Sequence, residues 1–566
     1  MFIFENLLRN EYFPEELPPC FQSDSFADNH EQIRSLIKSI NSSPADPLTF
    51  SGYKNTNSRR KFSIPNPLQY AKAADVIVSN STEIFKTLKK ANHSLTVPLA
   101  YAPAKNECYR KAVKKISESK AKIEKMYPNN LCEIRLDIQS FFDSVYTHSI
   151  AWAMHTKCTA KKHKKDKTLV GNLIDTCLQN LNSGQTNGIV IGNSISRIVS
   201  EIILSSVDLE ISNQLPGIKY VRYVDDYYIF IKDASQINEV LSVFRQELAK
   251  YELRLNENKL QINSSPFIYG KAWVEQIRAY ARLEPQLLLE KAIIEYHTYK
   301  DISILRYALN VIRGMCFNKG EWEKIEPLIF NIWISFPNLS NVITVIFKSN
   351  ENYLKPLLLK NSIYTILDTH ISLKNDEEVI WAIWAVKIFN IKISQNNIER
   401  IFDTDNWIAI IILLDILSTR KNEPKIKKEI DKFRNHIIDE YFSDSETNHA
   451  MYSNVWLLAY EADKNKWLNT SGTENFMFAR KDDFFKELRK LKVDFYSSSY
   501  NYDIIGKSKS EYNIYVTRKE LIELLKEYKL FFEEQQIRET PPPANVNLEE
   551  QIYVKIINAL KDVEKY

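Results

Sequence analysis

The sequence contains little glycine and cysteine, and it has no long hydrophobic run. Only 11 of 566 residues are glycine, and just four of them follow residue 280. The six cysteines have no CxxC spacing, which argues against a disulfide framework or a zinc site. The most apolar run, residues 407–414, is too short to span a bilayer. We therefore expect a soluble, cytoplasmic chain with no membrane partner.

The charges nearly cancel, with 75 basic against 71 acidic residues and a net charge of +4. This balance leaves room for a local basic groove, and it neither requires nor excludes a nucleic-acid partner. A chain of 566 residues with 44% apolar residues can bury more than one core, so two or more domains are expected.

The scarcity of glycine in the second half favours helices there. Four segments are apolar nearly all round and are separated by polar connectors: 306–315, 378–389, 407–417 and 453–462. Helices of this kind must be buried by neighbouring helices, as in a stacked helical array. No fixed repeat period is present, so irregular helical pairs describe the pattern best.

Carboxylates stand at the ends of two predicted strand elements. Residues 132–138 alternate with the period of a half-buried strand, which places Asp137 at the rim of a sheet. The stretch KYVRYVDDYYIFIK (219–232) predicts a hairpin with Asp225 and Asp226 at its tip. If the two elements are neighbours, three carboxylates converge, and their mutual repulsion would be relieved by a divalent metal.

Each carboxylate also has an ordinary structural explanation. Asp225 and Asp226 are compatible with a solvated turn, and Asp137 with a helix N-cap. Taken singly, either explanation is the more common one. The order of the motifs along the chain is what favours a catalytic site.

Further segments occur in a recognisable order. GQTNGIVIGNSISRIVSEIIL (184–204) reads as a glycine-serine loop leading into a long helix, RRKFSIPNPLQY (59–70) is basic, and LRLNENKLQI (253–262) supplies a lysine behind the hairpin. With the aspartates, these segments resemble the fingers and palm of reverse transcriptases. VYTHSIAW and IGNSISRI further resemble the bacterial abortive-infection group, which joins such a core to C-terminal helices.

The resemblance implies an α+β fold, with right-hand-type polymerase fingers and palm followed by an all-α, helical-repeat-like domain. The predicted order is an N-terminal arm, the fingers and palm, a helical array, a proline-rich linker and a C-terminal helix. The corresponding residues are 1–54, 55–275, 285–537, 538–547 and 548–566.

The resemblance also assigns catalytic roles. Asp137, Asp225 and Asp226 would hold Mg²⁺, with Mn²⁺ as the alternative ion. Lys259 would protonate the leaving pyrophosphate as a general acid, although a plain surface lysine is an equally ordinary reading. Tyr223 would support the primer end, whereas a tyrosine in a strand is usually packed.

The resemblance assigns nucleotide binding to a second set of residues. Arg60, with Lys61, matches the arginine that grips the incoming triphosphate, and a solvated basic turn is the competing interpretation. Phe142 occupies the steric-gate position that excludes a ribose 2′-hydroxyl, while Phe141 fits an ordinary core aromatic better. Gly192 lies in the glycine loop, at the position where the reverse-transcriptase pattern has a glycine.

One departure from the reverse-transcriptase pattern bears on function. Val190 and Ile191 stand where proline and glutamine usually precede the glycine, so the usual glutamine contact near the nascent base pair is missing. This loss puts templated copying in doubt. The abortive-infection group is associated with template-independent DNA synthesis started from a protein tyrosine, and the loss is compatible with that activity.

The leading hypothesis is therefore a phage-defence DNA polymerase that is protein-primed and template-independent. It would use deoxynucleoside triphosphates, make a DNA product covalently attached to the protein, and form a homo-oligomer. The alternatives are a conventional RNA-templated reverse transcriptase and a scaffold with an idle palm. Three intact aspartates argue against the scaffold.

Protein priming requires a tyrosine hydroxyl that reaches the active site. Tyr12 is the first candidate because the nearby prolines 14, 18 and 19 predict an extended segment able to lie across a groove. Tyr53, expected on a polar loop just ahead of Arg59, is the second. The alternative for Tyr12 is that it anchors the N-terminal arm against the core.

Overall fold

The computed structural model describes nine stretches of the chain, and every structural statement below refers to them. The predicted proline-rich linker (538–547) and C-terminal helix (548–566), as well as Cys108, lie outside the described residues. The stretches are residues 2–41, 43–55, 58–96, 116–271, 273–280, 284–421, 423–441, 449–469 and 482–500.

The chain divides into two compact units. The first consists of Met1–Gly270, Leu367–Trp384 and Ile393–Ser498, and the second includes Lys271–Ile366 and Ala385–Lys392. Segments from the second half of the sequence therefore share a unit with the predicted fingers and palm. The domain boundaries drawn from the sequence stay predictions.

The N-terminal arm is helical and is fixed at several points within the first unit. Its helices are α1 (Phe4–Arg9), α2 (Asp24–Asp28) and α3 (His30–Ser39). The backbone N–H of Gln22 donates to the Phe495 carbonyl (3.2 Å), and the Ser497 N–H donates to the Cys20 carbonyl (2.8 Å). The arm thus pairs with a segment that lies more than 470 positions away in the sequence.

The first two strands form an antiparallel pair, here called the N-terminal hairpin: β1 (Leu48–Asn55) and β2 (Ser58–Ile64). Helix α4 (Pro67–Ser79) follows, with Asn66 as its N-cap and Pro67 in its first turn. The Ser63 N–H donates to the Ile191 carbonyl (3.1 Å), which ties β2 to the glycine loop.

Acidic residues of helix α19 (Asp376–Ile388) cover the edge of the N-terminal hairpin. The Asp376 and Glu377 carboxylates accept hydrogen bonds from the backbone N–H groups of Ser51 (2.8 Å) and Tyr53 (2.7 Å). Two guanidinium nitrogens of Arg59 donate to the buried Glu378 carboxylate, each at 2.6 Å. The exposed row of donors that an edge strand presents is therefore capped by side chains from the helical half.

The larger sheet has four strands in the order β4-β5-β3-β6, and all neighbouring pairs are antiparallel. The strands are β3 (Cys132–Asp137), β4 (Lys219–Tyr223), β5 (Asp226–Ile231) and β6 (Gln261–Ser264). The predicted strand and hairpin are confirmed, and they are neighbours in one sheet. The predicted half-burial of β3 is wrong at Glu133, which is buried because Arg135 and Asn263 donate to its carboxylate.

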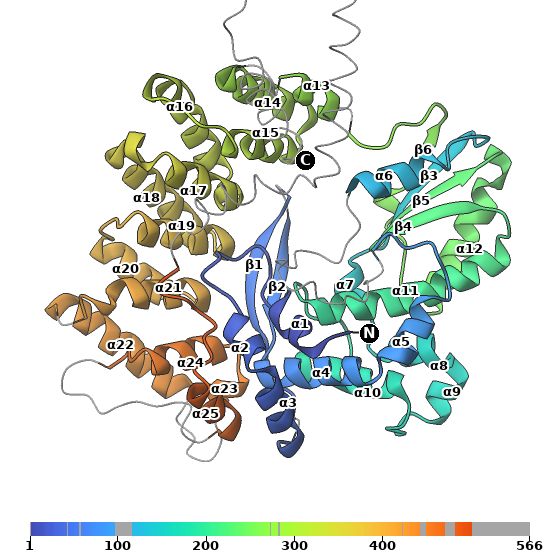
Figure 1. Ribbon diagram of the computed structural model, residues 1–566, viewed down its shortest axis with the longest axis horizontal. Coiled ribbons are helices and arrows are strands. Elements are labelled where there is room, and N and C mark those ends of the chain that lie inside the picture. Colours follow the sequence, from blue (N-terminus) through green and yellow to red (C-terminus); the bar gives the residue numbers. More distant parts are fainter. Residues whose placement is uncertain are drawn as a thin grey trace, which may run out of the picture. The chain divides into compact units, whose positions relative to one another are not determined.

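Helices cover both faces of this sheet, with α6 and α12 on opposite sides (Figure 1). Tyr227 packs edge-on against Phe244 of α12, whereas Phe230 belongs to a cluster with Ile123 of α6. The predicted long helix after the glycine loop is α11, which begins behind the N-cap Asn193. The helices of this region are α5 (Ser81–Leu88), α6 (Ile116–Glu124), α7 (Phe141–Ser144), α8 (Ser149–His155), α9 (Lys157–Lys162), α10 (Val170–Leu181), α11 (Ser194–Gln214) and α12 (Ile237–Ala249).

The second half of the chain is helical, as its composition predicts, and all four predicted helices are present. Trp322, Trp333, Trp384 and Trp456 are fully buried there, so helix-on-helix packing provides the core. Besides α19, its helices are α13 (Trp273–Tyr280), α14 (Pro285–Tyr299), α15 (Ser303–Arg313), α16 (Lys319–Ser335), α17 (Ser340–Ser349), α18 (Pro356–Ser372), α20 (Gln395–Phe402), α21 (Trp407–Ser418), α22 (Pro424–Tyr441), α23 (His449–Tyr452), α24 (Trp456–Lys464) and α25 (Asp483–Lys490).

Two further expectations can be compared with the structure. None of the five described cysteines forms a disulfide with another described cysteine. No single helix in the described stretches is long and apolar enough to cross a membrane. One pair bent by 117°, Lys319–Ser335 with Pro337–Ser349, reaches that length and composition only jointly.

Candidate active site

The hairpin of β4 and β5, here called the carboxylate hairpin, brings three aspartates together. Tyr223 pairs with Asp226, so Val224 and Asp225 form a two-residue loop. Asp226 also pairs with Asp137 at the end of β3. The predicted convergence of Asp137, Asp225 and Asp226 on one edge of the sheet is thus what the strand register produces.

The electrostatics of these aspartates show that they lie close together in a partly dehydrated place. Burial raises the pKa of Asp225, and the neighbouring charge of Asp137 adds to the rise. The pKa of Asp226 is raised to about 6 by burial and then by the charges of Asp225 and Asp137. Joint ionisation is therefore costly, which is the condition that a cation would relieve.

Two neighbours hold Asp137 in place. Lys259 Nζ and Asn256 Nδ2 each lie 2.9 Å from Asp137 Oδ2, and the Asn256 N–H donates to the Asp137 carbonyl (2.8 Å). The hydrogen bond to Asp137 raises the pKa of Lys259, which keeps its ammonium charged. The structure therefore brings Lys259 to the carboxylates, as predicted. Asn256 was not predicted, although it lies in the same quoted segment.

The chemistry of the three donors, though not the spacing of their side chains in this structure, suits a divalent metal. Carboxylate oxygens are the ligands that Mg²⁺ and Mn²⁺ prefer, and the pKa values of Asp225 and Asp226 are raised first by burial and then by the neighbouring carboxylate charges. Within the part of the chain that the structure describes, no three His, Cys, Asp or Glu side chains are spaced to hold an ion together. A positive charge is instead supplied to Asp137 by Lys259.

The predicted triphosphate grip lies on β2. Arg60 and Lys61 are exposed; burial and Asp137 raise the pKa of Asp225, and the charge of Arg60 opposes this rise only slightly. Their neighbour Arg59 is held by Glu378 and serves the anchoring of the hairpin.

The two phenylalanines differ in burial in the way that the predicted division of roles requires. Phe141 is buried at 2% exposure, whereas Phe142 is only partly buried, with the two rings 5.3 Å apart. The Ile189 N–H donates to the Phe142 carbonyl (2.9 Å), which fixes Phe142 against the glycine loop. Its role as a gate stays a prediction.

Gly192 and Tyr223 both have packing explanations. Gly192 has a φ of +106°, and a Cβ there would lie 2.7 Å from Pro14 Cγ, so the N-terminal arm leaves no room for a side chain. Tyr223 is partly buried against the cluster that contains Leu95 and Val221. The structure does not test a nucleotide contact for either residue.

Tyr12 does not lie in an open groove, so that expectation is wrong. Its side chain is fully buried, and its hydroxyl donates to the Pro65 carbonyl (2.6 Å). Its ring packs edge-on against Tyr70, with 4.7 Å between centroids, and burial raises its pKa well above the usual value. A hydroxyl so enclosed is not accessible as a primer. Tyr12 anchors the N-terminal arm, which is the alternative considered for it.

A buried polar network behind the carboxylate hairpin was missed by the sequence analysis. Arg222 pairs with Glu201 and Asp208 of α11, and Thr96 donates to Glu201 Oε1 (2.7 Å). Arg222, Glu201 and Asp208 are each at most 1% exposed. The available signal was a charged residue inside the apolar strand and two acids seven positions apart in an apolar helix.

Comparison with known families identifies the class of this site. Residues 78–279 match the family described as "Reverse transcriptase (RNA-dependent DNA polymerase)". The chain therefore carries a reverse-transcriptase-type polymerase domain, and this domain includes the sheet that bears the three aspartates. The predicted fold class, a right-hand-type polymerase core followed by helices, is confirmed.

Three of the solved structures to which the chain is distantly similar are telomerases. They are apo telomerase from Candida tropicalis truncated from its C-terminal domain (13% identity, 43% of this chain and 55% of that chain, TM-score 0.29), telomerase from Candida albicans in complex with a TWJ fragment of telomeric RNA (10%, 74% and 66%, 0.28) and apo telomerase from Candida tropicalis (12%, 82% and 77%, 0.31). The chain spans about half the length of the first of these. No curated protein matches the chain.

Proposed function

We propose that the protein is a DNA polymerase of the abortive-infection type, which adds deoxynucleotides to a tyrosine of its own chain without a template. The observation that carries the polymerase reaction is the meeting of Asp137, Asp225 and Asp226 at one sheet edge. The assignment to phage defence depends on the resemblance of VYTHSIAW and IGNSISRI alone.

The reaction is a nucleotidyl transfer. A hydroxyl oxygen attacks the α-phosphorus of a deoxynucleoside triphosphate, a new P–O bond forms, and the bond to the β-phosphate breaks to release pyrophosphate. Divalent metal held by Asp137, Asp225 and Asp226 would activate the attacking oxygen and stabilise the departing one. Mg²⁺ is the proposed ion, with Mn²⁺ as the alternative.

The chain's own residues bind the nucleotide and move the proton. Arg60 and Lys61 bind the triphosphate by charge-assisted hydrogen bonds, and Phe142 excludes the ribose 2′-hydroxyl. Lys259 donates a proton to the leaving pyrophosphate; its position 2.9 Å from Asp137 Oδ2 supports this role, whereas its raised pKa makes it a weaker acid than an ordinary lysine.

The glycine loop supports template independence. Val190, where the family pattern has proline, is buried, and its carbonyl accepts hydrogen bonds from Asn193 Nδ2 (3.0 Å) and Ser196 Oγ (2.6 Å). Ile191, where the pattern has glutamine, offers no side-chain donor to a base pair. The loop is therefore ordered by its own contacts and presents an apolar residue at the position of the usual amide.

The priming tyrosine is proposed to be one other than Tyr12. Tyr53 is the next candidate, since it lies on β1 beside Arg59 and is only partly buried. The test is mass spectrometry of the purified full chain after incubation with one deoxynucleotide and Mg²⁺. We expect a protein mass increased by whole nucleotides and a modified tyrosine in peptide maps; an unmodified protein that extends an added primer on an RNA template would support the conventional reverse transcriptase instead.

A further inference from the structure

The loop of the carboxylate hairpin is strained at the residue that precedes Asp225. Val224 has a φ of +54°, in the left-handed region that favours glycine. A β-branched residue there is an outlier, and the strained conformation persists only where the surroundings enforce it. Something in the structure must therefore hold Val224 in this conformation.

Both backbone polar groups of Val224 have buried partners. Its N–H donates to Thr96 Oγ1 (3.1 Å), and its carbonyl accepts from Arg222 Nη1 (2.8 Å). The loop is thus held from both sides of the strained residue.

The two partners are joined through one carboxylate. Thr96 Oγ1 donates to Glu201 Oε1 (2.7 Å), and Arg222 donates to both Glu201 oxygens, each at 3.1 Å. Arg222 Nε also donates to Asp208 Oδ2 (3.0 Å). Because these groups are desolvated, removing one partner leaves another unsatisfied, so the arrangement is held as a unit.

The segment that carries Thr96 is itself held beside β4. The Leu95 N–H donates to the Arg222 carbonyl (2.7 Å), and the Arg222 N–H donates to the His93 carbonyl (2.9 Å). Ser94 Oγ accepts from the Thr96 N–H (3.0 Å). Thr96 is therefore a fixed support for the loop.

The network lies behind the reacting groups. Arg222 pairs with Tyr227 across the hairpin, one position away from the pair of Tyr223 with Asp226, so its side chain is on the opposite face of the sheet from Asp226. Asp137 shares the face of Asp226 because the two are register partners. Arg222 acts on the site through the backbone of the loop.

We propose that Thr96, Glu201 and Arg222 are positioning residues of the nucleotidyl transfer: their network holds Val224 in the left-handed conformation that presents Asp225 and Asp226 at the sheet edge. This inference rests on the proposed function. It assigns the three residues a role in the rate of the chemical step rather than in nucleotide binding.

The test is a double-mutant cycle between Thr96 and Val224 with deoxynucleotide incorporation by the full chain as the readout. Thr96→Val removes the hydroxyl at nearly constant volume. It should lower kcat roughly tenfold to hundredfold, because a buried hydrogen bond is lost and Val224 can relax from its strained conformation. KM should change little. Thr96→Ser, which keeps the hydroxyl, should restore most of kcat. Thr87→Val, another buried threonine of the first unit, is the matched control.

The decisive comparison is the effect of Thr96→Val in the parent and in the Val224→Gly variant. Glycine adopts a φ of +54° without strain, so Thr96→Val should there reduce kcat by less than about threefold. An equal loss in both backgrounds, or no loss in either, would overturn the inference. Should Thr96→Val not fold, Thr96→Ala, which places no methyl against Glu201, is compared in the same two backgrounds.

The two proposals fail in distinguishable ways. If Asp225→Asn incorporates nucleotide as well as the parent, the proposed function is wrong whatever the Thr96 variants do. If Asp225→Asn is inactive and the Thr96 cycle shows no coupling, the polymerase site stands and the positioning role is wrong.

Discussion

The two β-hairpins of the first unit carry the proposed catalytic charges, and they are held in place by different parts of the chain. The carboxylate hairpin is supported by Thr96, Glu201 and Asp208, all of which precede it by fewer than 130 positions. The N-terminal hairpin is supported by Asp376, Glu377 and Glu378, more than 300 positions further along the chain.

The kind of support differs as well. Behind the carboxylate hairpin, the buried Arg222 pairs with Glu201 and Asp208, and the three reacting aspartates are not part of this network. On the N-terminal hairpin, Arg59 itself forms the supporting ion pair with Glu378, while the neighbouring Arg60 is exposed. The proposed metal-binding edge is thus built by the polymerase domain, whereas the proposed triphosphate-binding residues depend on the helical half for their position. Four predictions separate these two regions.

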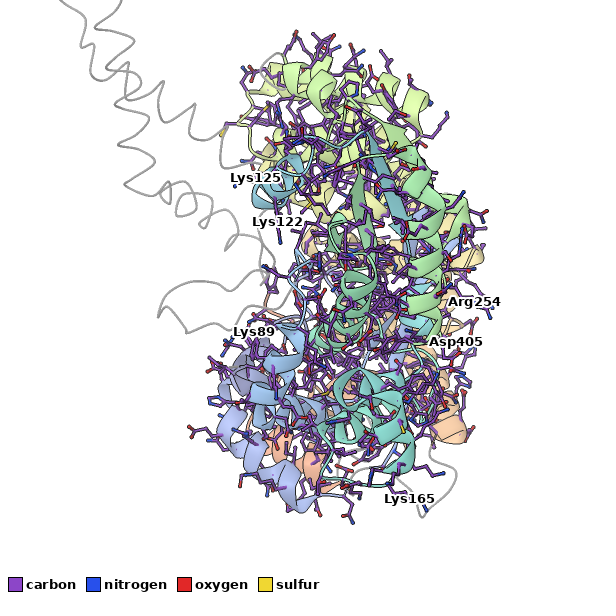
Figure 2. The ribbon with its side chains drawn as sticks, turned by 90° about the vertical axis from the view of Figure 1, so that its right-hand side faces the viewer. Lys89, Lys122, Lys125, Lys165, Arg254 and Asp405 are labelled. Carbon is purple, nitrogen blue, oxygen red and sulfur yellow. The ribbon has the colours of Figure 1, made fainter. Side chains whose placement is uncertain are left out.

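The largest effect is expected at the carboxylate hairpin. Asp225→Asn should reduce nucleotide incorporation by at least about a thousandfold, because a metal ligand is lost from the site. Its melting temperature should not fall, since the variant removes repulsion between neighbouring carboxylates. Steady-state incorporation and thermal unfolding measure the two. Asp405→Asn, an exposed aspartate labelled in Figure 2, is the control and should change neither.

At the N-terminal hairpin we expect a large loss of stability and a smaller loss of activity. Arg59→Ala leaves the buried Glu378 carboxylate without its partner and should lower the free energy of unfolding by roughly 3 kcal/mol. The KM for deoxynucleotide should rise more than kcat falls, because Arg60 loses its alignment. Denaturant unfolding and steady-state kinetics provide the comparison.

A matched control for that variant is Arg245→Ala. Arg245 makes a similar two-nitrogen pair with Glu257, but both side chains are about half exposed, so the loss should stay under about 1 kcal/mol. Equal destabilisation by the two variants would show that helix α19 does not anchor the hairpin.

Substrate choice provides the third test. Phe142→Ala should admit ribonucleotides that the parent rejects, with discrimination reduced roughly tenfold or more, in keeping with about 1–3 kcal/mol for a steric contact of this size. Competition between dATP and ATP measures it. Unchanged discrimination would remove Phe142 from the gate, and the deoxynucleotide preference would then need another source.

The smallest effect concerns pH. Burial raises the pKa of Glu377 to about 8, and the charges of Glu378 and Glu16 add to the rise. The hydrogen bond from the Tyr53 N–H and the charge of Arg59 oppose it. A carboxyl whose pKa is raised in the folded state binds more protons there than when unfolded. Its stabilising contribution is full at low pH and is lost as pH rises towards 8.

The melting temperature should therefore fall by roughly a few degrees between pH 5 and pH 8. Glu377→Gln should remove this part of the pH dependence. A parallel decline in the variant and the parent would place the titration elsewhere.

The sequence predicted the parts that depend on short-range pattern. Strand β3, the aromatic strands around Asp225 and Asp226, and the apolar helices of the second half all have local signals, and the structure has each of them, although β3 is buried on both faces and not on one alone. The convergence of the aspartates followed because a sheet has few ways to arrange two such elements.

The rest depends on contacts between distant residues, which leave little local trace. Neither the pairing of Arg222 with Glu201 nor that of Arg59 with Glu378 could be read from spacing. Tyr12 shows the same limit: its prolines indicated an extended arm, but the aromatic cluster that buries its ring comes from Phe26, Tyr70 and Phe495.

The central claim, that the three aspartates perform template-free nucleotidyl transfer, is tested most directly by one measurement. Nuclease-treated full-length protein is incubated with labelled deoxynucleotide and Mg²⁺, without primer or template, and the label retained on the denatured chain is counted beside Asp225→Asn. The account predicts label on the parent and none on Asp225→Asn. Label on both proteins, or on the parent only after an RNA template is added, would contradict it.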